Sequence, residues 1–180
     1  MKSFRRIFRV AVSLLMLCIL AVAGYNIAMK HVYPKDYIDL AKNYGEEYNV
    51  PWTLVMAVIK CESKFDPKAR SERDAVGLMQ LTEETFYDMR DAVGDDESVI
   101  FPVHAEDPEI NIKYGTRYLR YLSEYFGGDT TAVIAAYNAG LSNVKKWMGD
   151  DGKLTLEEIM FPETSAYVER VIKTEKQYRK

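Results

Sequence analysis

One stretch of the sequence places a carboxylate where it could act as a general acid. Residues 52–59 follow Pro51 and are apolar at almost every position, so they predict a buried helix with Glu62 at its C-terminal end. Apolar surroundings and the negative end of the helix dipole both disfavour an ionised carboxylate. We therefore expect a raised pKa for Glu62 and a proton available near neutral pH, as general acid catalysis requires. Taken alone, the pattern is more typical of a surface glutamate at a helix end.

Three further stretches combine polar side chains with glycine or other small residues, which let a backbone approach a ligand closely. These stretches are residues 71–80, 135–140 and 163–168. Their amide-bearing and aromatic side chains are of the kinds that stack on sugar rings and bind hydroxyl and acetamido groups. The candidates are Gln80, Tyr137, Asn138 and Tyr167. Each also has an ordinary interpretation as a core residue or a helix end, so only the combination points to a carbohydrate site.

In their order and spacing, these motifs resemble the catalytic domain of the soluble lytic transglycosylase family, a branch of the lysozyme-like superfamily. The motifs that carry the resemblance are Glu62-Ser63, Gly77-Leu78-Met79-Gln80, Ala136-Tyr137-Asn138-Ala139-Gly140, and Glu163-Thr164 followed by Tyr167-Val168. The resemblance covers residues 34–173 and implies that Glu62 is the catalytic acid and base. It also implies that several residues bind the substrate and that the Tyr167 hydroxyl lies near the Glu62 carboxylate. The residues implied in substrate binding are Ser63, Met79, Gln80, Tyr137, Asn138 and Tyr167.

The activity that the resemblance implies is that of a peptidoglycan lytic transglycosylase. Such an enzyme cleaves the β-1,4 bond between N-acetylmuramic acid and N-acetylglucosamine in glycan strands without water and leaves 1,6-anhydromuramic ends; no cofactor or metal is implied. One alternative is a hydrolytic muramidase of the lysozyme type, which would need a second carboxylate such as Asp66, Asp74 or Glu83. Another is a non-catalytic peptidoglycan-binding module, which has no use for a carboxylate at the end of that helix.

Three positions depart from the usual pattern of the family. Asp74 stands where glycine is common, Leu141 where proline is common, and Ser165 where arginine is frequent. Asp74 adds a charge to a loop beside the expected groove, so we expect it to influence substrate preference. Cys61, next to Glu62, is expected to point into the helix packing.

An all-α, lysozyme-like fold must position these residues. Helical periodicity extends over nearly all of the chain after Pro34, and a small hairpin could lie within residues 68–80. Capping signals mark the helix starts. Expected caps are Thr82, Asp107, Asp129 and the capping box of Thr155 with Glu158. The predicted helices cover residues 35–48, 52–62, the stretch after Thr82, 108–125, 130–138 and 163–178.

Length and composition fit a single domain. The chain has 180 residues, of which 48% are hydrophobic and 28% charged, so it can bury a core. Its two cysteines cannot form a disulfide framework. The formal net charge is −3 although the first nine residues carry four cations and no acid, so the remainder is more acidic still. An acidic body without a basic stripe excludes nucleic acid as the main partner.

The N-terminal residues 1–29 predict an export segment. A basic head, residues 1–9, precedes an apolar run over residues 10–23 that only Ser13 interrupts. Cleavage after Ala23 would release a soluble protein. Continued through Met29, the segment would be about 20 residues, just long enough to cross a membrane, and an uncleaved anchor is the preferred interpretation. Either way, residues 30–180 would form one extracytoplasmic catalytic domain on a bacterial cell.

Overall fold

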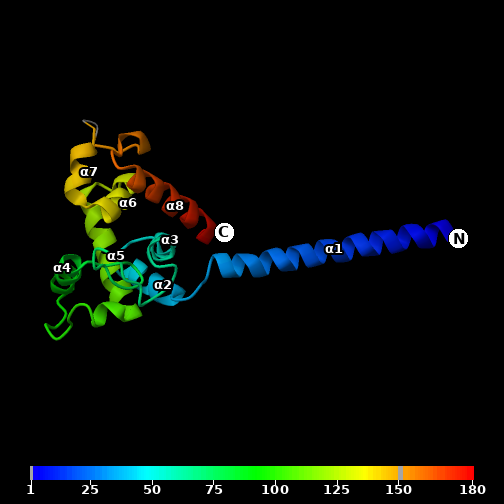
Figure 1. The fold of residues 1–180 in the computed structure, drawn as a ribbon, viewed down its shortest axis with the longest axis horizontal. Coiled ribbons are helices and arrows are strands. Elements are labelled where there is room, and N and C mark those ends of the chain that lie inside the picture. Colours follow the sequence, from blue (N-terminus) through cyan, green and yellow to red (C-terminus); the bar gives the residue numbers. More distant parts are fainter. Residues whose placement is uncertain (1, 150–151) are drawn as a thin grey trace. The chain divides into compact units, whose positions relative to one another are not determined.

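The computed structural model describes residues 2–149 and 152–180, which form helices, short 3₁₀ turns and loops. The chain divides into two compact units, Met1–Lys35 and Asp36–Lys180. The first unit is essentially one helix, α1 (Lys2–Val32), drawn in blue in Figure 1. By length and hydropathy, no helix among the described residues qualifies as a membrane span, so the membrane-spanning part of the prediction for residues 1–29 is not supported by the structure.

The second unit is all-α, as predicted. Its helices are α2 (Ile38–Glu47), α3 (Trp52–Glu62), α4 (Glu83–Val93), α5 (Pro108–Tyr125), α6 (Thr130–Ala139), α7 (Leu141–Trp147) and α8 (Pro162–Tyr178). Two 3₁₀ turns, η1 (His104–Glu106) and η2 (Leu156–Glu158), precede α5 and α8. The hairpin considered for residues 68–80 is reduced to isolated β-bridges that pair Val76 with Arg70 and with Leu81.

Helix α3 forms the centre of this unit. Every residue from Thr53 to Ile59 is buried, which confirms the prediction of a helix that is apolar all round. The helix packs against α2 and α8, while α5 packs against α2, α4 and α6. Figure 1 shows α6, α7 and α8 gathered near one end of α5. The C-terminal end of α3 is therefore held between elements that are far apart in the sequence.

A second group of apolar side chains fixes α4 on α5. The buried ring of Phe86 contacts Tyr114 at 5.0 Å and Phe101 at 5.7 Å between ring centroids, both edge to face. The predicted cap Thr82 accepts a hydrogen bond from the Thr85 amide at the start of α4. Aromatic packing thus holds α4 against α5. Residues in the N-terminal half of α4 line the cavity that is described below.

The loop between α3 and α4 is held by one buried side chain. Asn111 donates to the carbonyl oxygens of Val76 at 3.0 Å and Ala105 at 2.7 Å, and its Oδ1 accepts from the Met79 amide at 2.7 Å. Gly77 in this loop has φ +85°, and a Cβ there would collide with the Ala105 carbonyl and with Asn111. The glycine is therefore required where the loop crosses the start of α5.

Two details of the predicted helices differ from the structure. Helix α7 follows α6 directly after Gly140 and has no counterpart among the predicted helices. The capping box of Thr155 and Glu158 is present, but it caps only the single 3₁₀ turn η2. The expected caps Asp107 and Asp129 both accept hydrogen bonds from amides in the first turns of their helices, as predicted.

Candidate active site

Glu62 is the last residue of α3, and the chain turns sharply after it. Lys64 and Phe65 both have positive φ, at 55° and 72°. The buried Ser63 hydroxyl donates to the Ile59 carbonyl and accepts from the Phe65 amide, each at 3.1 Å. The hydroxyl thus donates and accepts within the backbone around Glu62, and these contacts fix the turn that follows Glu62.

The Glu62 carboxylate lies in a largely dry environment. Burial raises its pKa from 4.5 to about 7, against the opposing effects of a hydrogen bond from Tyr167 and the positive charge of Arg170. The Tyr167 hydroxyl donates to Glu62 Oε1 at 2.5 Å, and Tyr167 itself is buried. The direction of the pKa shift confirms the prediction for Glu62, with burial as its main cause. Tyr167 lies beside the carboxylate, as the resemblance implies.

Tyr137 lies near enough to Glu62 for the charge of the carboxylate to act on it, and it lines the cavity described below. Its hydroxyl donates to the Met79 carbonyl at 2.8 Å, and burial together with the negative charge of Glu62 raises its pKa. The Met79 side chain is completely buried and packs tightly on Gly115. The structure therefore brings the backbone of Met79, rather than its side chain, to the candidate site.

Gln80 and Asn138 have amides that are oriented by their neighbours. Gln80 donates to the carbonyl oxygens of Ala69 at 3.0 Å and Gly77 at 2.9 Å. The buried Thr164 hydroxyl donates to Asn138 Oδ1 at 2.8 Å. That bond directs the Asn138 carbonyl oxygen towards α8 and leaves its N–H groups without a partner among the described residues. An amide nitrogen free to donate is what a sugar hydroxyl or acetamido oxygen requires.

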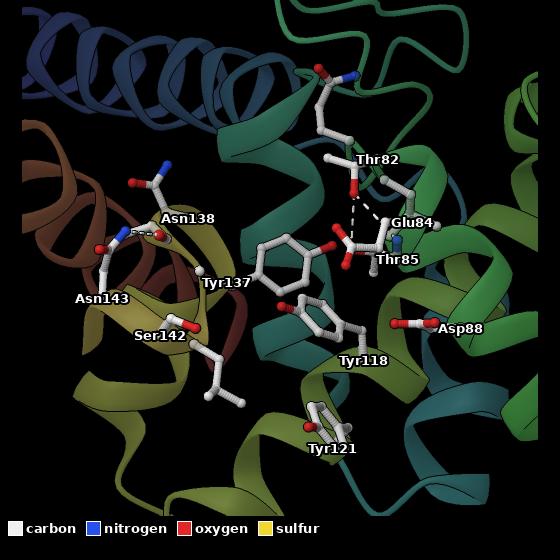
Figure 2. Close-up of a pocket in the computed structure, with 15 residues that line it drawn as sticks. Thr82, Glu84, Thr85, Asp88, Tyr118, Tyr121, Tyr137, Asn138, Ser142 and Asn143 are labelled. Carbon is white, nitrogen blue, oxygen red and sulfur yellow. Dashed lines mark hydrogen bonds between the residues drawn. The ribbon is translucent and has the colours of Figure 1, made fainter. Parts of the chain in front are cut away.

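An open cavity of about 510 Å³ adjoins these residues. Figure 2 shows its two walls, with Thr82, Glu84, Thr85 and Asp88 on one side and Asn138, Ser142 and Asn143 on the other. Tyr118 and Tyr121 of α5 lie between the walls, beside Tyr137. Of the residues predicted from the sequence, Gln80, Tyr137 and Asn138 line the cavity, whereas Glu62, Ser63, Met79 and Tyr167 lie outside its lining.

Several residues of the cavity were not predicted from the sequence. Tyr118 and Tyr121 are three positions apart in a predicted helix and therefore share a face, which was an available signal. Thr164 lies outside the cavity lining, and its hydrogen bond to Asn138, which lines the cavity, was not predicted either. Glu84 and Asp88 have the ordinary appearance of acidic residues near a helix start. Asn143 belongs to α7, the helix that the sequence did not reveal.

The three departures from the family pattern have local explanations. Asp74 has φ 57°, a conformation that favours glycine and that aspartate tolerates better than most residues. Leu141 is the first residue of α7, a position where proline is also favoured. The Ser165 hydroxyl contacts the Leu156 carbonyl at 3.5 Å. Cys61 points towards α8, with its Sγ 3.9 Å from Thr174 Oγ1, as expected.

Comparison with known proteins gives consistent matches. The model of the transglycosylase SLT domain matches residues 39–160. The chain is 34% identical over 157 residues to the soluble lytic murein transglycosylase of Escherichia coli (strain K12), covering 82% of this chain and 23% of that protein. It is 37% identical over 127 residues to the membrane-bound lytic murein transglycosylase C of Edwardsiella ictaluri (strain 93-146), covering 64% and 34% of the two chains.

Solved structures agree with these matches. An inactive mutant of lytic transglycosylase Slt from Pseudomonas aeruginosa superposes with a TM-score of 0.76 at 27% identity, covering 83% of this chain and 25% of that one. The 70 kDa soluble lytic transglycosylase of Escherichia coli superposes with a TM-score of 0.75 at 35% identity, covering 82% and 24%. The chain thus spans about a quarter of the length of these three relatives.

Proposed function

Since the chain belongs to the transglycosylase SLT family, we propose that it is a peptidoglycan lytic transglycosylase. It would cleave the β-1,4 bond between N-acetylmuramic acid and N-acetylglucosamine. The observation that carries the proposal is a single carboxylic acid, Glu62, whose pKa is raised to about 7 by burial. This group accepts a hydrogen bond from the Tyr167 hydroxyl at 2.5 Å. An acid of this kind holds its proton near neutral pH and can release it to a leaving group.

The first step is protonation of the leaving group. Glu62 gives its proton to the oxygen that links the two sugars, the bond from this oxygen to the anomeric carbon breaks, and N-acetylglucosamine leaves with a new hydroxyl. The acetamido oxygen of the muramic unit bonds to the anomeric carbon and meets the positive charge that develops there. This substrate assistance replaces the second carboxylate of ordinary glycosidases.

The second step closes a ring and returns the proton. Ionised Glu62 takes the proton of the muramic C6 hydroxyl, the C6 oxygen bonds to the anomeric carbon, and the acetamido oxygen is displaced. The product is a 1,6-anhydro sugar, no water is consumed, and Glu62 is protonated again. The hydrogen bond from Tyr167 supports the state between the two steps, because a donor stabilises the ionised carboxylate.

Substrate positioning is assigned to the residues that face the cavity. Gln80, Tyr137 and Asn138 would hold the glycan strand through an aromatic face and amide hydrogen bonds. For Ser63 and Met79, direct substrate contact stays a prediction, and their observed contacts support a positioning role. The Ser63 hydroxyl fixes the turn after Glu62, and the Met79 carbonyl anchors the Tyr137 hydroxyl.

The main competing function is hydrolysis of the same bond. The carboxylates considered for that route, Asp66, Asp74 and Glu83, are all exposed residues outside the cavity lining. Since Glu62 also lies outside the cavity lining, the products of the reaction decide between the two routes. A purely binding module is disfavoured because a buried carboxyl group costs free energy of folding that glycan binding alone does not require.

Product mass distinguishes these functions. Purified peptidoglycan is digested with the full chain, and the released muropeptides are measured by mass spectrometry, with Glu62→Gln as the background control. We expect anhydromuramyl ends, each lighter by one water than a hydrolytic end. Reducing ends alone would establish a muramidase, and binding of intact strands without release of muropeptides would establish a binding module.

We also propose that residues 1–29 direct the catalytic domain, residues 30–180, out of the cytoplasm. The support is the basic head before an apolar run and the exposure of many apolar side chains along α1. Cell fractionation and N-terminal sequencing of the full chain distinguish an uncleaved membrane anchor from cleavage after Ala23. Recovery of the intact chain in the cytosol would contradict both forms of the proposal.

A further inference from the structure

We propose that the α4 side of the cavity, formed by Glu84 and Asp88 over Tyr118 and Tyr121, binds a unit of peptidoglycan that carries a protonated primary amine. The inference deepens the proposed function, on which it rests, by naming the substrate chemistry that this part of the cavity selects. The four residues are referred to below as the amine subsite.

The charge of the amine subsite is uncompensated. Glu84 and Asp88 are one helical turn apart on α4, both are exposed, and both line the cavity. Neither carboxylate has a hydrogen bond or an ion pair with the described residues. The cavity lining, all of which lies in the described part of the chain, contains no lysine, arginine or histidine. Two negative charges therefore face a space of about 510 Å³ without a protein cation to balance them.

The floor of the amine subsite is aromatic. The rings of Tyr118 and Tyr121 are nearly parallel, with an interplanar angle of 16° and centroids 6.2 Å apart, and Tyr118 lies 5.4 Å from Tyr137. Burial raises the pKa of Tyr118 to about 12, and the charges of Glu84 and Asp88 add to the effect, so both carboxylates act on this ring. Aromatic faces accept sugar rings and also attract cations.

Charge complementarity decides which ligand fits. Hydroxyl and acetamido N–H groups can donate hydrogen bonds to these carboxylates but leave their two negative charges unbalanced, and the free carboxylates of stem peptides are repelled by them. A protonated amine is attracted by both the carboxylates and the aromatic floor. In peptidoglycan such an amine has two sources: a glucosamine residue that lacks its acetyl group, and the side-chain amine of a diamino acid in a stem peptide.

Binding of matched probes tests the inference. The full chain with Glu62→Gln, which leaves glycans intact, is titrated by calorimetry with a glucosamine tetramer and an N-acetylglucosamine tetramer. A second pair of probes is a stem tripeptide ending in a diamino acid, with its side-chain amine free or acetylated. At low salt we expect the amine-bearing probe of at least one pair to bind more tightly than its acetylated counterpart, by about twofold to fivefold for each carboxylate. This preference should be reduced at high salt.

Variants assign the preference to the amine subsite. Combining Glu84→Gln with Asp88→Asn should remove the preference, whereas Glu83→Gln should retain it. Glu83 is a matched control because it is an exposed acid on the same helix outside the cavity lining. Preference for the sugar pair or for the peptide pair identifies the source of the amine, and either supports the inference.

Three results would overturn the inference: equal binding within both pairs, a preference that survives the double substitution, or an equal loss in Glu83→Gln. These results are separable from failure of the proposed function. Release of anhydromuramyl products together with equal binding within both pairs would leave the activity in place and reject only the amine subsite.

Discussion

The molecule holds carboxylates in two contrasting environments, one at the end of α3 and one on the cavity side of α4. Glu62 ends a buried helix, is covered by Tyr167, and has a pKa raised to about 7. Glu84 and Asp88 on α4 are exposed and have no partner among the described residues. The same chemical group can thus transfer a proton at Glu62 and present a negative charge at Glu84 and Asp88.

The difference shows that the surrounding structure, not the residue type, decides what a carboxylate can do. Removal from water makes ionisation costly and gives Glu62 a proton to donate, whereas solvent stabilises charge and weakens its interactions. Each environment depends on a different part of the fold. Glu62 is buried by the contacts of α3 with α8, and the α4 carboxylates are held over the cavity by the cluster around Phe86.

The largest expected effect comes from removing the proton donor. Glu62→Gln should reduce release of anhydromuropeptides by about 100-fold to about 10,000-fold, because general acid–base assistance is lost while the shape of the side chain is kept. Circular dichroism should show an unchanged helical fold, and Glu83→Gln, which removes an exposed acid outside the cavity lining, should retain the activity. A Glu62→Gln protein with native activity would reject Glu62 as the acid.

Stability should depend on pH through Glu62. Its folded pKa of about 7 exceeds the ordinary 4.5, so between these values the folded state holds a proton that the unfolded state has lost. The free energy of unfolding therefore falls as the pH rises through this window, by up to about 3 kcal/mol relative to Glu62→Gln. Urea unfolding of both proteins between about pH 4 and about pH 8 measures the difference. A difference that grows in favour of the native chain as the pH rises would contradict the burial of a neutral carboxyl group.

A smaller effect is expected from the hydroxyl that contacts Glu62. Tyr167→Phe removes one hydrogen bond to a charged group, which should lower kcat/KM by about tenfold to about hundredfold. That bond favours the ionised carboxylate, so its loss should also raise the pKa of Glu62 further. The alkaline limb of the pH profile should then move to higher pH. A shift to lower pH would mean that Tyr167 does not stabilise the carboxylate.

Features encoded by neighbouring residues could be predicted from the sequence. The apolar run of α3 predicts burial whatever packs against it. The same pattern predicts that the Glu62 carboxylate lies at the C-terminal end of this buried helix. Caps such as Asp107 and Asp129 act within a few residues of their own position, so their patterns can be read directly. A position where proline is common in the family, here Leu141, is also typical of a helix start, and α7 begins there.

Features created by contacts between distant segments could not be predicted. Asp95, in the acidic stretch that follows α4, accepts from Lys113 Nζ at 2.7 Å and from the Tyr114 hydroxyl at 2.8 Å, and both partners belong to α5. The role of Glu84 and Asp88 depends on how α4 docks against α5. Periodicity assigns them to an exposed face but does not indicate that a cavity lies there.

The last prediction concerns the side chain that orients the Asn138 amide. Thr164→Val removes the hydroxyl that orients the Asn138 amide, so we expect KM for glycan strands to rise about twofold to tenfold with kcat nearly unchanged. Thr164→Ser should restore KM because it keeps the donor. Thr116→Val is the matched control, since the buried Thr116 hydroxyl has no partner among the described residues. If Thr164→Val lowers stability but leaves KM as it is in the native chain, the hydroxyl supports the fold and not the orientation of Asn138.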